Sequence, residues 1–142
     1  MTLPSSETLH ASTVAIGGKA VLITGLSGSG KSDLALRLID RGAVLVSDDY
    51  TIVSRAGDEL SACAPSTIKG KLEIRGVGLL AMPVEDHVPI AMIIDLVTPV
   101  TRLPEAWEMR VILGVTLPVV PLAGFETSAA IKVENALRNL PC

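Results

Sequence analysis

The sequence predicts an α/β domain with a mixed sheet, flanking hairpins and few helices, built around a phosphate-binding loop. Three consecutive stretches indicate this fold class. Residues 21–24 are apolar or β-branched, residues 25–32 are rich in glycine and serine, and residues 33–41 carry apolar side chains at helical spacing. A strand, a glycine-rich loop and a helix in this order form the usual setting of a nucleotide-phosphate site.

The loop reads G-x-x-x-x-G-K-S, which is the Walker A pattern. Its glycines let backbone N–H groups turn inward, and the partial positive charge of the helix N-terminus favours phosphate. Lys31 is expected to reach the β- and γ-phosphates, and the Ser32 hydroxyl to ligate Mg²⁺. An ordinary Gly/Ser turn is the alternative, which both flanks disfavour. The predicted nucleotide-binding residues are Gly25, Leu26, Ser27, Gly28, Ser29, Gly30, Lys31 and Ser32.

Composition and charge narrow the functional classes. The 142 residues suit one domain, and 49% apolar with 2% aromatic residues predicts an aliphatic core. A net charge of −3 without a basic run argues against nucleic acid. The apolar stretch 88–100 is too short to span a membrane, and residues 1–7 do not form a signal peptide. Cys63 and Cys142 have neither metal-ligand nor disulfide spacing, so we predict a cytoplasmic protein.

The chain before the loop predicts a hairpin. Residues 1–9 are expected to be a loose lead-in, and residues 10–16 a strand that returns over 19–24 through a Gly-Gly turn. Antiparallel pairing then brings His10 beside the phosphate loop. A surface histidine at the start of a strand is the alternative.

After the loop, residues 33–41 predict a helix that Gly42 ends in a left-handed conformation. Residues 43–47 predict a strand parallel to the first, with the helix as crossover. That strand ends at Asp48 and Asp49, and ligands bind at the carboxyl ends of such strands. Two adjacent acids suit Mg²⁺ binding and proton transfer, whereas an acidic turn is the alternative.

The middle of the chain predicts further extended segments. Residues 50–55 and 59–63 indicate a hairpin, and residues 72–80 one extended segment with Glu73 and Arg75 on the same face. A surface pair on an edge strand is the alternative for those two residues.

The last third predicts a loop at 83–89 and a buried strand at 91–95. That strand ends in Asp95, which is an alternative candidate to Asp48 and Asp49 for the metal ligand. Residues 109–117 predict one apolar strand, and Pro118, Pro121 and Gly124 a loop. Residues 127–140 fit a final helix with Ala130, Val133, Ala136, Leu137 and Leu140 facing inward.

Three features together resemble the catalytic domain of HPr kinase/phosphorylase. They are the phosphate loop, the Asp48–Asp49 pair beginning 17 residues after Lys31, and the segment Leu-Glu-Ile-Arg-Gly-Val-Gly-Leu-Leu at 72–80. The glutamate–arginine–glycine signature distinguishes this family from other P-loop proteins, which lack it. The similarity covers residues 10–119 and implies a P-loop kinase-like domain, in a short form without the N-terminal domain of longer members.

The resemblance implies an ATP- and Mg²⁺-dependent protein serine kinase. Its substrate would be HPr, the small phosphocarrier of the bacterial sugar phosphotransferase system, or a related phosphocarrier. Family members also run phosphorolysis, in which phosphate removes the phosphoryl group and yields pyrophosphate. They are typically hexamers, so His10 and Arg102 are expected near subunit borders.

The resemblance also implies roles for single residues. Lys31 would hold the transferred phosphoryl group, and either Asp48 or Asp49 would be the general base. The implied catalytic residues are His10, Lys31, Asp48, Asp49, Arg75 and Arg102. The implied metal ligands are Ser32, Asp49 and Glu73.

The chain departs from the family at two places. Members usually carry an arginine in the proline-rich loop before the last helix, which is important for phosphorolysis. Residues 118–124 contain neither arginine nor lysine, and the loop between residues 80 and 89 is contracted. The resemblance therefore supports the kinase direction more strongly than phosphorolysis.

Two alternatives of other classes stay open. A small-molecule P-loop kinase would need lid arginines, and the arginines beyond the first helix do not cluster in the sequence. A nucleotide-sensing module without catalysis would not need the acids Asp48, Asp49 and Glu73.

Overall fold

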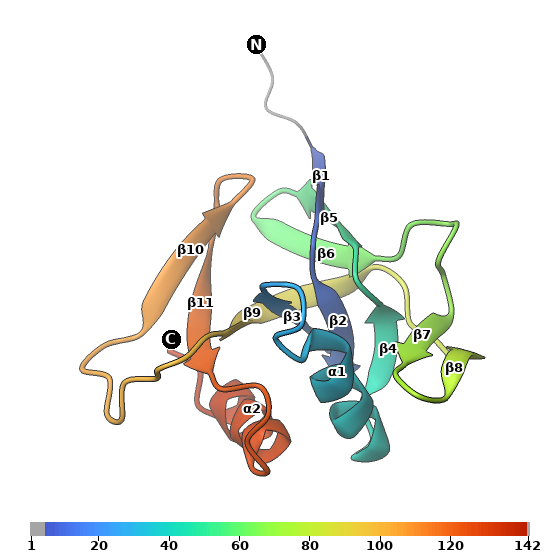
Figure 1. Cartoon of the computed structure of the whole chain (residues 1–142). Coiled ribbons are helices and arrows are strands. Elements are labelled where there is room, and N and C mark those ends of the chain that lie inside the picture. The colour runs from blue at the N-terminus through green and yellow to red at the C-terminus, as the bar shows by residue number, and fades with distance from the viewer. Residues whose placement is uncertain (1–4, 142) are drawn as a thin grey trace.

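The computed structural model describes residues 5–141 and consists of a curled nine-stranded sheet, a two-stranded ribbon and two helices (Figure 1). This confirms the predicted α/β class with few helices. The strands are β1 (Ser6–Leu9), β2 (Ser12–Ile16), β3 (Lys19–Gly25), β4 (Val44–Ser47), β5 (Thr51–Ala56), β6 (Glu59–Cys63), β7 (Lys71–Ile74), β8 (Gly78–Ala81), β9 (Val88–Leu96), β10 (Glu108–Ile112) and β11 (Val115–Leu122). The helices are α1 (Lys31–Asp40) and α2 (Ala129–Arg138).

The large sheet is mixed and branches at β9. Its main path runs β1-β5-β6-β9-β3-β2-β4, and β11 with β10 forms a second branch. One edge of β9 pairs antiparallel with β6 at Val88 and Pro89, and then parallel with β11 from Ile93 to Leu96. The other edge pairs parallel with β3. From the edge that β6 and β11 share, the two branches spread apart (Figure 1).

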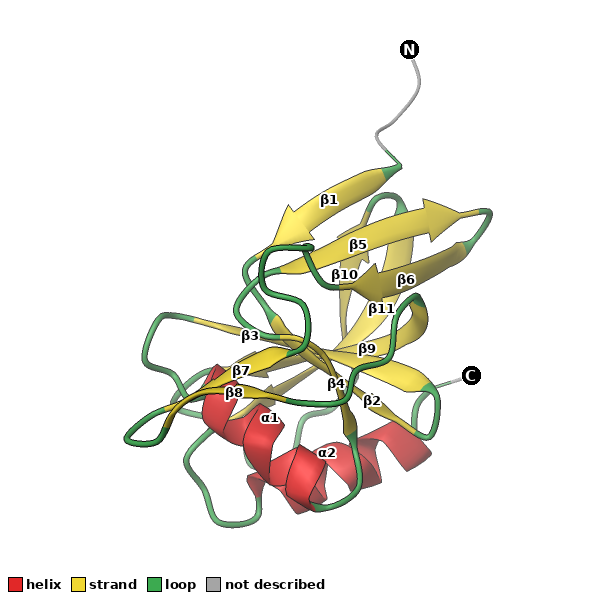
Figure 2. Cartoon of the chain, turned by 90° about the vertical axis from the view of Figure 1, so that its right-hand side faces the viewer, coloured by secondary structure: helices red, strands yellow, loops and turns green. Residues whose placement is uncertain are grey.

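The core has two layers because the central strands are buried on both faces. In β3, Val21 and Ile23 pack with α1 and α2 on one face, while Ala20 and Leu22 pack with the curled branches on the other. This alternation is the period of two expected of a strand. Both helices lie on the same side of the sheet (Figure 2).

Both helices meet the sequence prediction. Leu34, Ala35 and Leu38 of α1 are buried, and Gly42 has φ 109°, so it provides the predicted left-handed stop. In α2, Ala130, Val133 and Leu137 are buried, and Ala136 and Leu140 are partly buried against the same core. Neither helix within residues 5–141 is long and apolar enough to cross a membrane.

The hairpin before the loop is also confirmed. β2 and β3 pair antiparallel across Gly17 and Gly18, both with positive φ. β4 runs parallel to β3 as predicted, but the two are not neighbours, because β2 lies between them and pairs antiparallel with each. Residues 51–63 form the expected hairpin of β5 and β6.

Four expectations were wrong in detail. Residues 6–9 of the supposed lead-in form β1, which pairs with β5, whereas residues 1–4 lie outside the described part. Residues 72–80 form the hairpin β7–β8, since glycine permits the φ of 83° at Gly76 in its turn. The supposed loop at 83–89 ends early, because β9 begins at Val88.

The fourth concerns residues 109–124. The apolar run at 109–117 folds back at Leu113 and Gly114, both with positive φ, and forms β10 and the start of β11. Pro118 and Pro121 lie inside β11 rather than in a loop. Prolines are tolerated there because β11 changes partner at Val119, so that Pro118 has only β10 beside it and Pro121 only β9.

Candidate functional site

The phosphate loop lies between the end of β3 at Gly25 and the start of α1 at Lys31. Gly28 and Gly30 have φ of 83° and 99°, which favours glycine at both positions. Lys31 is 7% exposed, and its Nζ donates to the carbonyl oxygens of Gly25 and Leu26 at 2.9 and 3.0 Å. The ammonium group is thus held against the loop beside the N-terminus of α1, where positive potential attracts an anion.

A second segment, residues 123–126, braces this loop. A Cβ on Gly124 would lie 2.6 Å from the backbone oxygen of Ser29, and a Cβ on Gly30 would lie 3.1 Å from the Phe125 ring. Arg37 of α1 donates to the backbone oxygens of Glu126, at 2.9 Å, and Gly124. The loop, the first helix and this segment therefore form one packed unit.

Asp48 is the polar centre of the site and is only 7% exposed. Its Oδ1 accepts from the hydroxyls of Ser12, at 2.9 Å, and Ser32, at 2.6 Å. Its Oδ2 accepts from the backbone N–H of Glu73 at 3.1 Å. Asp48 therefore ties together β2, the start of α1 and the β7–β8 hairpin.

Asp49 has a different environment although it is the next residue. Its φ of 66° turns it out of the strand, and its carboxylate is more than half exposed. Asp49 Oδ1 lies 2.8 Å from His10 Nε2, and the His10 ring stacks on Tyr50 with centroids 5.1 Å apart. The backbone N–H of Asp49 donates to Ser12 Oγ at 3.1 Å, which fixes its position beside Asp48. His10 and Asp49 therefore form an accessible pair at the edge of the site.

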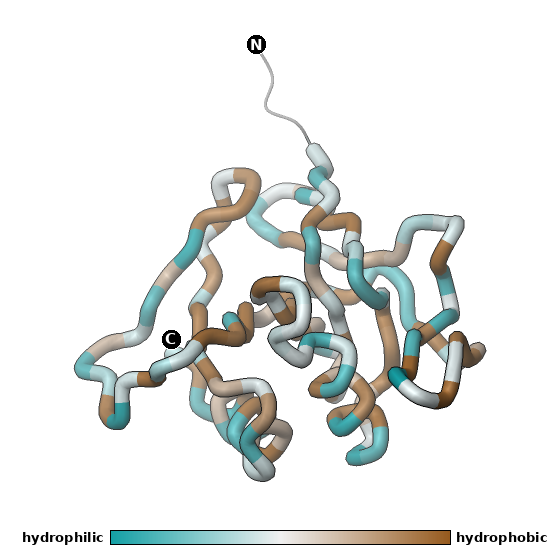
Figure 3. The backbone as a smooth tube through the Cα atoms, in the orientation of Figure 1, coloured by the Kyte–Doolittle hydropathy of each residue, from teal (hydrophilic) through white to brown (hydrophobic). Residues whose placement is uncertain are grey.

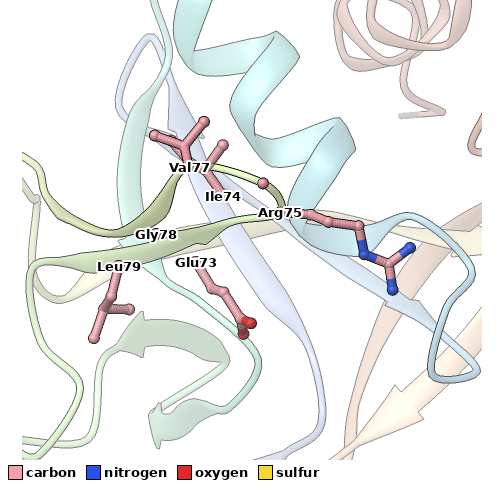
Figure 4. Close-up of a pocket in the computed structure, with 7 residues that line it drawn as sticks. Glu73, Ile74, Arg75, Val77, Gly78 and Leu79 are labelled. Carbon is pink, nitrogen blue, oxygen red and sulfur yellow. The ribbon is translucent and has the colours of Figure 1, made fainter.

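A cavity of about 420 Å³, which we call the carboxylate pocket, joins these groups. Its lining includes Lys31, Ser32, Asp49, Glu73 and Arg75, but not the side chain of Asp48. In Figure 4 the Arg75 side chain extends from the β7–β8 turn toward the phosphate loop, while Glu73 and Leu79 point to the other side of the hairpin from Val77. The hairpin thus brings the glutamate–arginine signature to the phosphate loop.

The predicted metal ligands Ser32, Asp49 and Glu73 all line the carboxylate pocket. Hydroxyl and carboxylate oxygens are the donors that Mg²⁺ prefers. The residues present therefore fit a magnesium ion. Within residues 5–141 no group of three or more histidine, cysteine or acidic side chains is close enough to form a cage by itself. Mg²⁺ usually keeps water and substrate phosphate among its ligands, so this finding is compatible with such an ion.

Two other sequence candidates lie apart from this pocket. Asp95 accepts from Thr24 Oγ1 at 2.9 Å and lies 3.4 Å from Arg110, so its carboxylate is engaged on the other side of the phosphate loop. Arg102 lies in the exposed segment between β9 and β10 and is not among the residues that line the carboxylate pocket.

Sequence reasoning missed two residues of the site. Ser12 bridges Asp48 and the backbone of Asp49, but a serine at the start of a strand carries no visible signal. Phe125 packs on Gly30, and it is the only phenylalanine in the chain. A single aromatic residue directly after Gly124, in a chain so poor in aromatics, was the available signal.

The fold and the site define a P-loop domain of the kinase type. A model of the HPr serine kinase C-terminal domain matches residues 1–140. The chain belongs to that family.

Similar proteins agree with this assignment. An HPr kinase/phosphorylase of Alkaliphilus metalliredigens is 38% identical over 97% of this chain and 49% of its own length. One from Chlorobaculum tepidum is 35% identical over 82% of this chain and 38% of its own length. The solved structure of the Hpr(Ser) kinase/phosphatase from Coxiella burnetii matches with a TM-score of 0.82 and 30% identity, covering 94% of this chain and 95% of that one. The chain thus spans about half or less of the length of these two curated relatives.

Proposed function

We propose that the protein is an ATP- and Mg²⁺-dependent kinase that phosphorylates a serine of HPr or a related phosphocarrier. The observation that carries this proposal is the carboxylate pocket, in which the Walker A lysine, two acids and the signature arginine lie together. A nucleotide sensor needs the loop but not the acids. The names of the similar proteins support HPr as the substrate class.

We assign the general base to Asp49. Asp48 accepts three hydrogen bonds and is 7% exposed, so its carboxylate is occupied in holding the site together. Asp49 is accessible and lines the carboxylate pocket. In the transfer, Asp49 accepts the proton of the serine hydroxyl, the serine oxygen bonds to the γ-phosphorus, and the bond from that phosphorus to the ADP oxygen breaks.

The other groups hold charge and orientation. Lys31 and Arg75 neutralise the phosphoryl oxygens, and His10 orients the Asp49 carboxylate. Ser32 and Glu73, with Asp49 beside them, would hold Mg²⁺, which supplies charge neutralisation when bound. In phosphorolysis the proton on Asp49 returns to the serine oxygen while inorganic phosphate takes the phosphoryl group as pyrophosphate.

We also propose a cytoplasmic location and a homo-oligomer, a hexamer by resemblance. An exposed apolar face on β10, with Met109 and Val111 at 52% and 63% exposure, supports association.

The test is transfer of phosphate to purified HPr, followed by intact-mass measurement. With Mg²⁺ and ATP, HPr is expected to gain one phosphoryl group on a serine, and excess phosphate then to remove it with release of pyrophosphate. Asp49→Asn is expected to slow transfer by a factor of about 10² or more. Asp58→Asn, in the exposed β5–β6 turn, is the matched control and should transfer normally. Unmodified HPr would exclude the proposed substrate, and phosphate on a small metabolite would indicate the small-molecule kinase.

A further inference from the structure

A second cavity lies on the opposite side of the phosphate loop. It is larger, about 920 Å³, and is lined by residues 25–29 of the loop, residues 95–98 at the end of β9 and residues 123–126 after β11. We call it the strand-edge cleft, because the carboxyl ends of three parallel strands, β3, β9 and β11, meet there. The cleft and the carboxylate pocket share the lining residues Ser27, Gly28 and Phe125, so they adjoin each other at the loop.

We propose that the strand-edge cleft is the subsite for the nucleoside half of the nucleotide, and that Phe125 is the surface on which the base stacks. This inference rests on the proposed function, because it takes a nucleotide as the phosphate donor. It adds the place, the orientation and a specific contact for the part of the donor that does not react.

The two cavities are lined by different kinds of side chain, and this difference predicts how the nucleotide is oriented. The groups suited to phosphoryl transfer, Lys31, Asp49 and Arg75, line the carboxylate pocket and not the strand-edge cleft. A triphosphate held by the loop has its γ-phosphate in the carboxylate pocket, since the general base Asp49 and the cations Lys31 and Arg75 are there. Its nucleoside then leaves the loop on the opposite side, which is the strand-edge cleft.

The cleft suits a flat apolar ligand more than a charged one. Its two acids are already paired, Asp95 with Thr24 and Arg110, and Glu126 with Lys132. Leu96, Val97 and Phe125 supply apolar surface, and Gly25 and Gly124 let the walls approach closely. Nucleotide sites are typically of this kind, mostly apolar with few polar groups, and of several hundred Å³.

Phe125 has the properties of a prepared stacking surface. Its side chain is 70% exposed, although it is the only phenylalanine in the chain. Its ring is close to Gly30, and Arg37 fixes the backbone on both sides of it through the oxygens of Gly124 and Glu126. An exposed ring held in place loses little freedom when a base covers it.

Calorimetric titration of the full chain with ATP and, separately, with inorganic tripolyphosphate, both with Mg²⁺, tests the proposal. Phe125→Ala is expected to weaken ATP binding about tenfold, the effect of losing one base–aromatic stack, and to leave tripolyphosphate binding within about twofold. Phe125→Tyr keeps the ring and should bind ATP like the native chain. Ile131→Ala, which removes apolar surface at an exposed site on α2 outside both cavities, is the matched control.

The other outcomes are distinguishable. Equal weakening of both ligands by Phe125→Ala would mean that the ring only supports the phosphate loop, and unchanged ATP binding would place the base elsewhere. Either result overturns this inference and leaves the proposed kinase intact. If the native chain binds neither ligand, the nucleotide-dependent function itself is wrong, and the subsite falls with it.

Discussion

At the scale of single residues, the adjacent acids Asp48 and Asp49 have different roles because the backbone places their side chains differently. Asp48 directly follows β4 and is buried, whereas Asp49, with its left-handed φ of 66°, carries a carboxylate that is more than half exposed. One side chain stabilises the site and the other is available for chemistry. The sequence alone could not say which of the two is the general base, because the backbone dihedral that separates them is not visible in it.

The free energy of unfolding should separate the two acids. Asp48→Asn keeps the shape of the side chain but replaces a charged acceptor of three hydrogen bonds, and we expect it to lower stability by about 1–3 kcal/mol. Asp49→Asn should change stability by less than about 0.5 kcal/mol, since this side chain is largely exposed and asparagine tolerates positive φ. Urea denaturation of both variants measures the difference. Equal losses would contradict the assignment of Asp48 as the structural member.

Lys31 is the second buried charged residue of the site within residues 5–141. Lys31→Ala should reduce phosphoryl transfer to HPr by a factor of 10² or more, because it removes the ammonium group that the Gly25 and Leu26 carbonyl oxygens hold against the loop. Lys19→Ala, exposed at the start of β3, is the control and should keep native transfer. Native turnover by Lys31→Ala would remove the basis for a Walker A mechanism here.

At the scale of elements, α1 connects the reacting groups to the core. Its first turn carries Lys31 and Ser32, and its buried side packs Leu34, Ala35 and Leu38 between the sheet and α2. Arg37 and Arg41 on its other side reach residues 123–126 and Glu134 of α2. The Glu134 carboxylate, which accepts a hydrogen bond from Arg41, raises the pKa of that guanidinium.

Leu38→Ala tests how much this packing contributes. Leu38 is fully buried, so we expect a loss of about 2–5 kcal/mol from transfer free energy and the cavity left behind. Ile131→Ala on the exposed side of α2, where the side chain is 46% exposed, should cost much less. Thermal and urea unfolding of both variants provide the comparison. A loss below about 1 kcal/mol for Leu38→Ala would mean that the helix is not anchored there.

Elements were predictable from the sequence where periodicity and turn chemistry agreed. Gly17 and Gly18 determined a hairpin, and the apolar stripe of α1 with Gly42 determined a helix and its end. Residues 109–117 failed because the fold-back at Leu113 puts an apolar residue at positive φ, where sequence patterns expect glycine or asparagine. The β7–β8 hairpin failed because the glycines at 76 and 78 were interpreted as close-approach positions rather than as part of a turn.

The candidate site was predicted in part for the same kind of reason. The phosphate loop is contiguous, so its motif identified Lys31 and Ser32 directly. Ser12 is brought to the site by the order of the strands in the sheet, and Phe125 by the path of the segment after β11. No local sequence pattern encodes either arrangement.

At the scale of the whole molecule, β10 is one of the edge strands of the sheet. Within residues 5–141 it pairs with β11 alone, and the tip of the β10–β11 hairpin is largely hydrophobic (Figure 3). Met109 and Val111 alternate with charged residues along β10, so both project from one face.

We expect this face to take part in the proposed oligomer. Val111→Glu should lower the mass measured by sedimentation velocity, while leaving the secondary structure seen by circular dichroism unchanged. Ile131→Glu, on the exposed side of α2, is the control and should keep the native mass. An unchanged mass for Val111→Glu would move the interface to another face.

The position of β9 in the sheet has a consequence for biosynthesis. Three of its neighbours come from distant parts of the chain: β3 at residues 19–25, β6 at 59–63 and β11 at 115–122. Until residue 96 has left the ribosome, the emerging β3 has β2 on one side and an open edge on the other. Unpaired strand edges promote aggregation. Chaperones or rapid synthesis of β9 must therefore keep the apolar residues Val21, Leu22 and Ile23 from aggregating. A translational pause before β9 is made would therefore lower the yield of folded protein, whereas a pause after β11 would not.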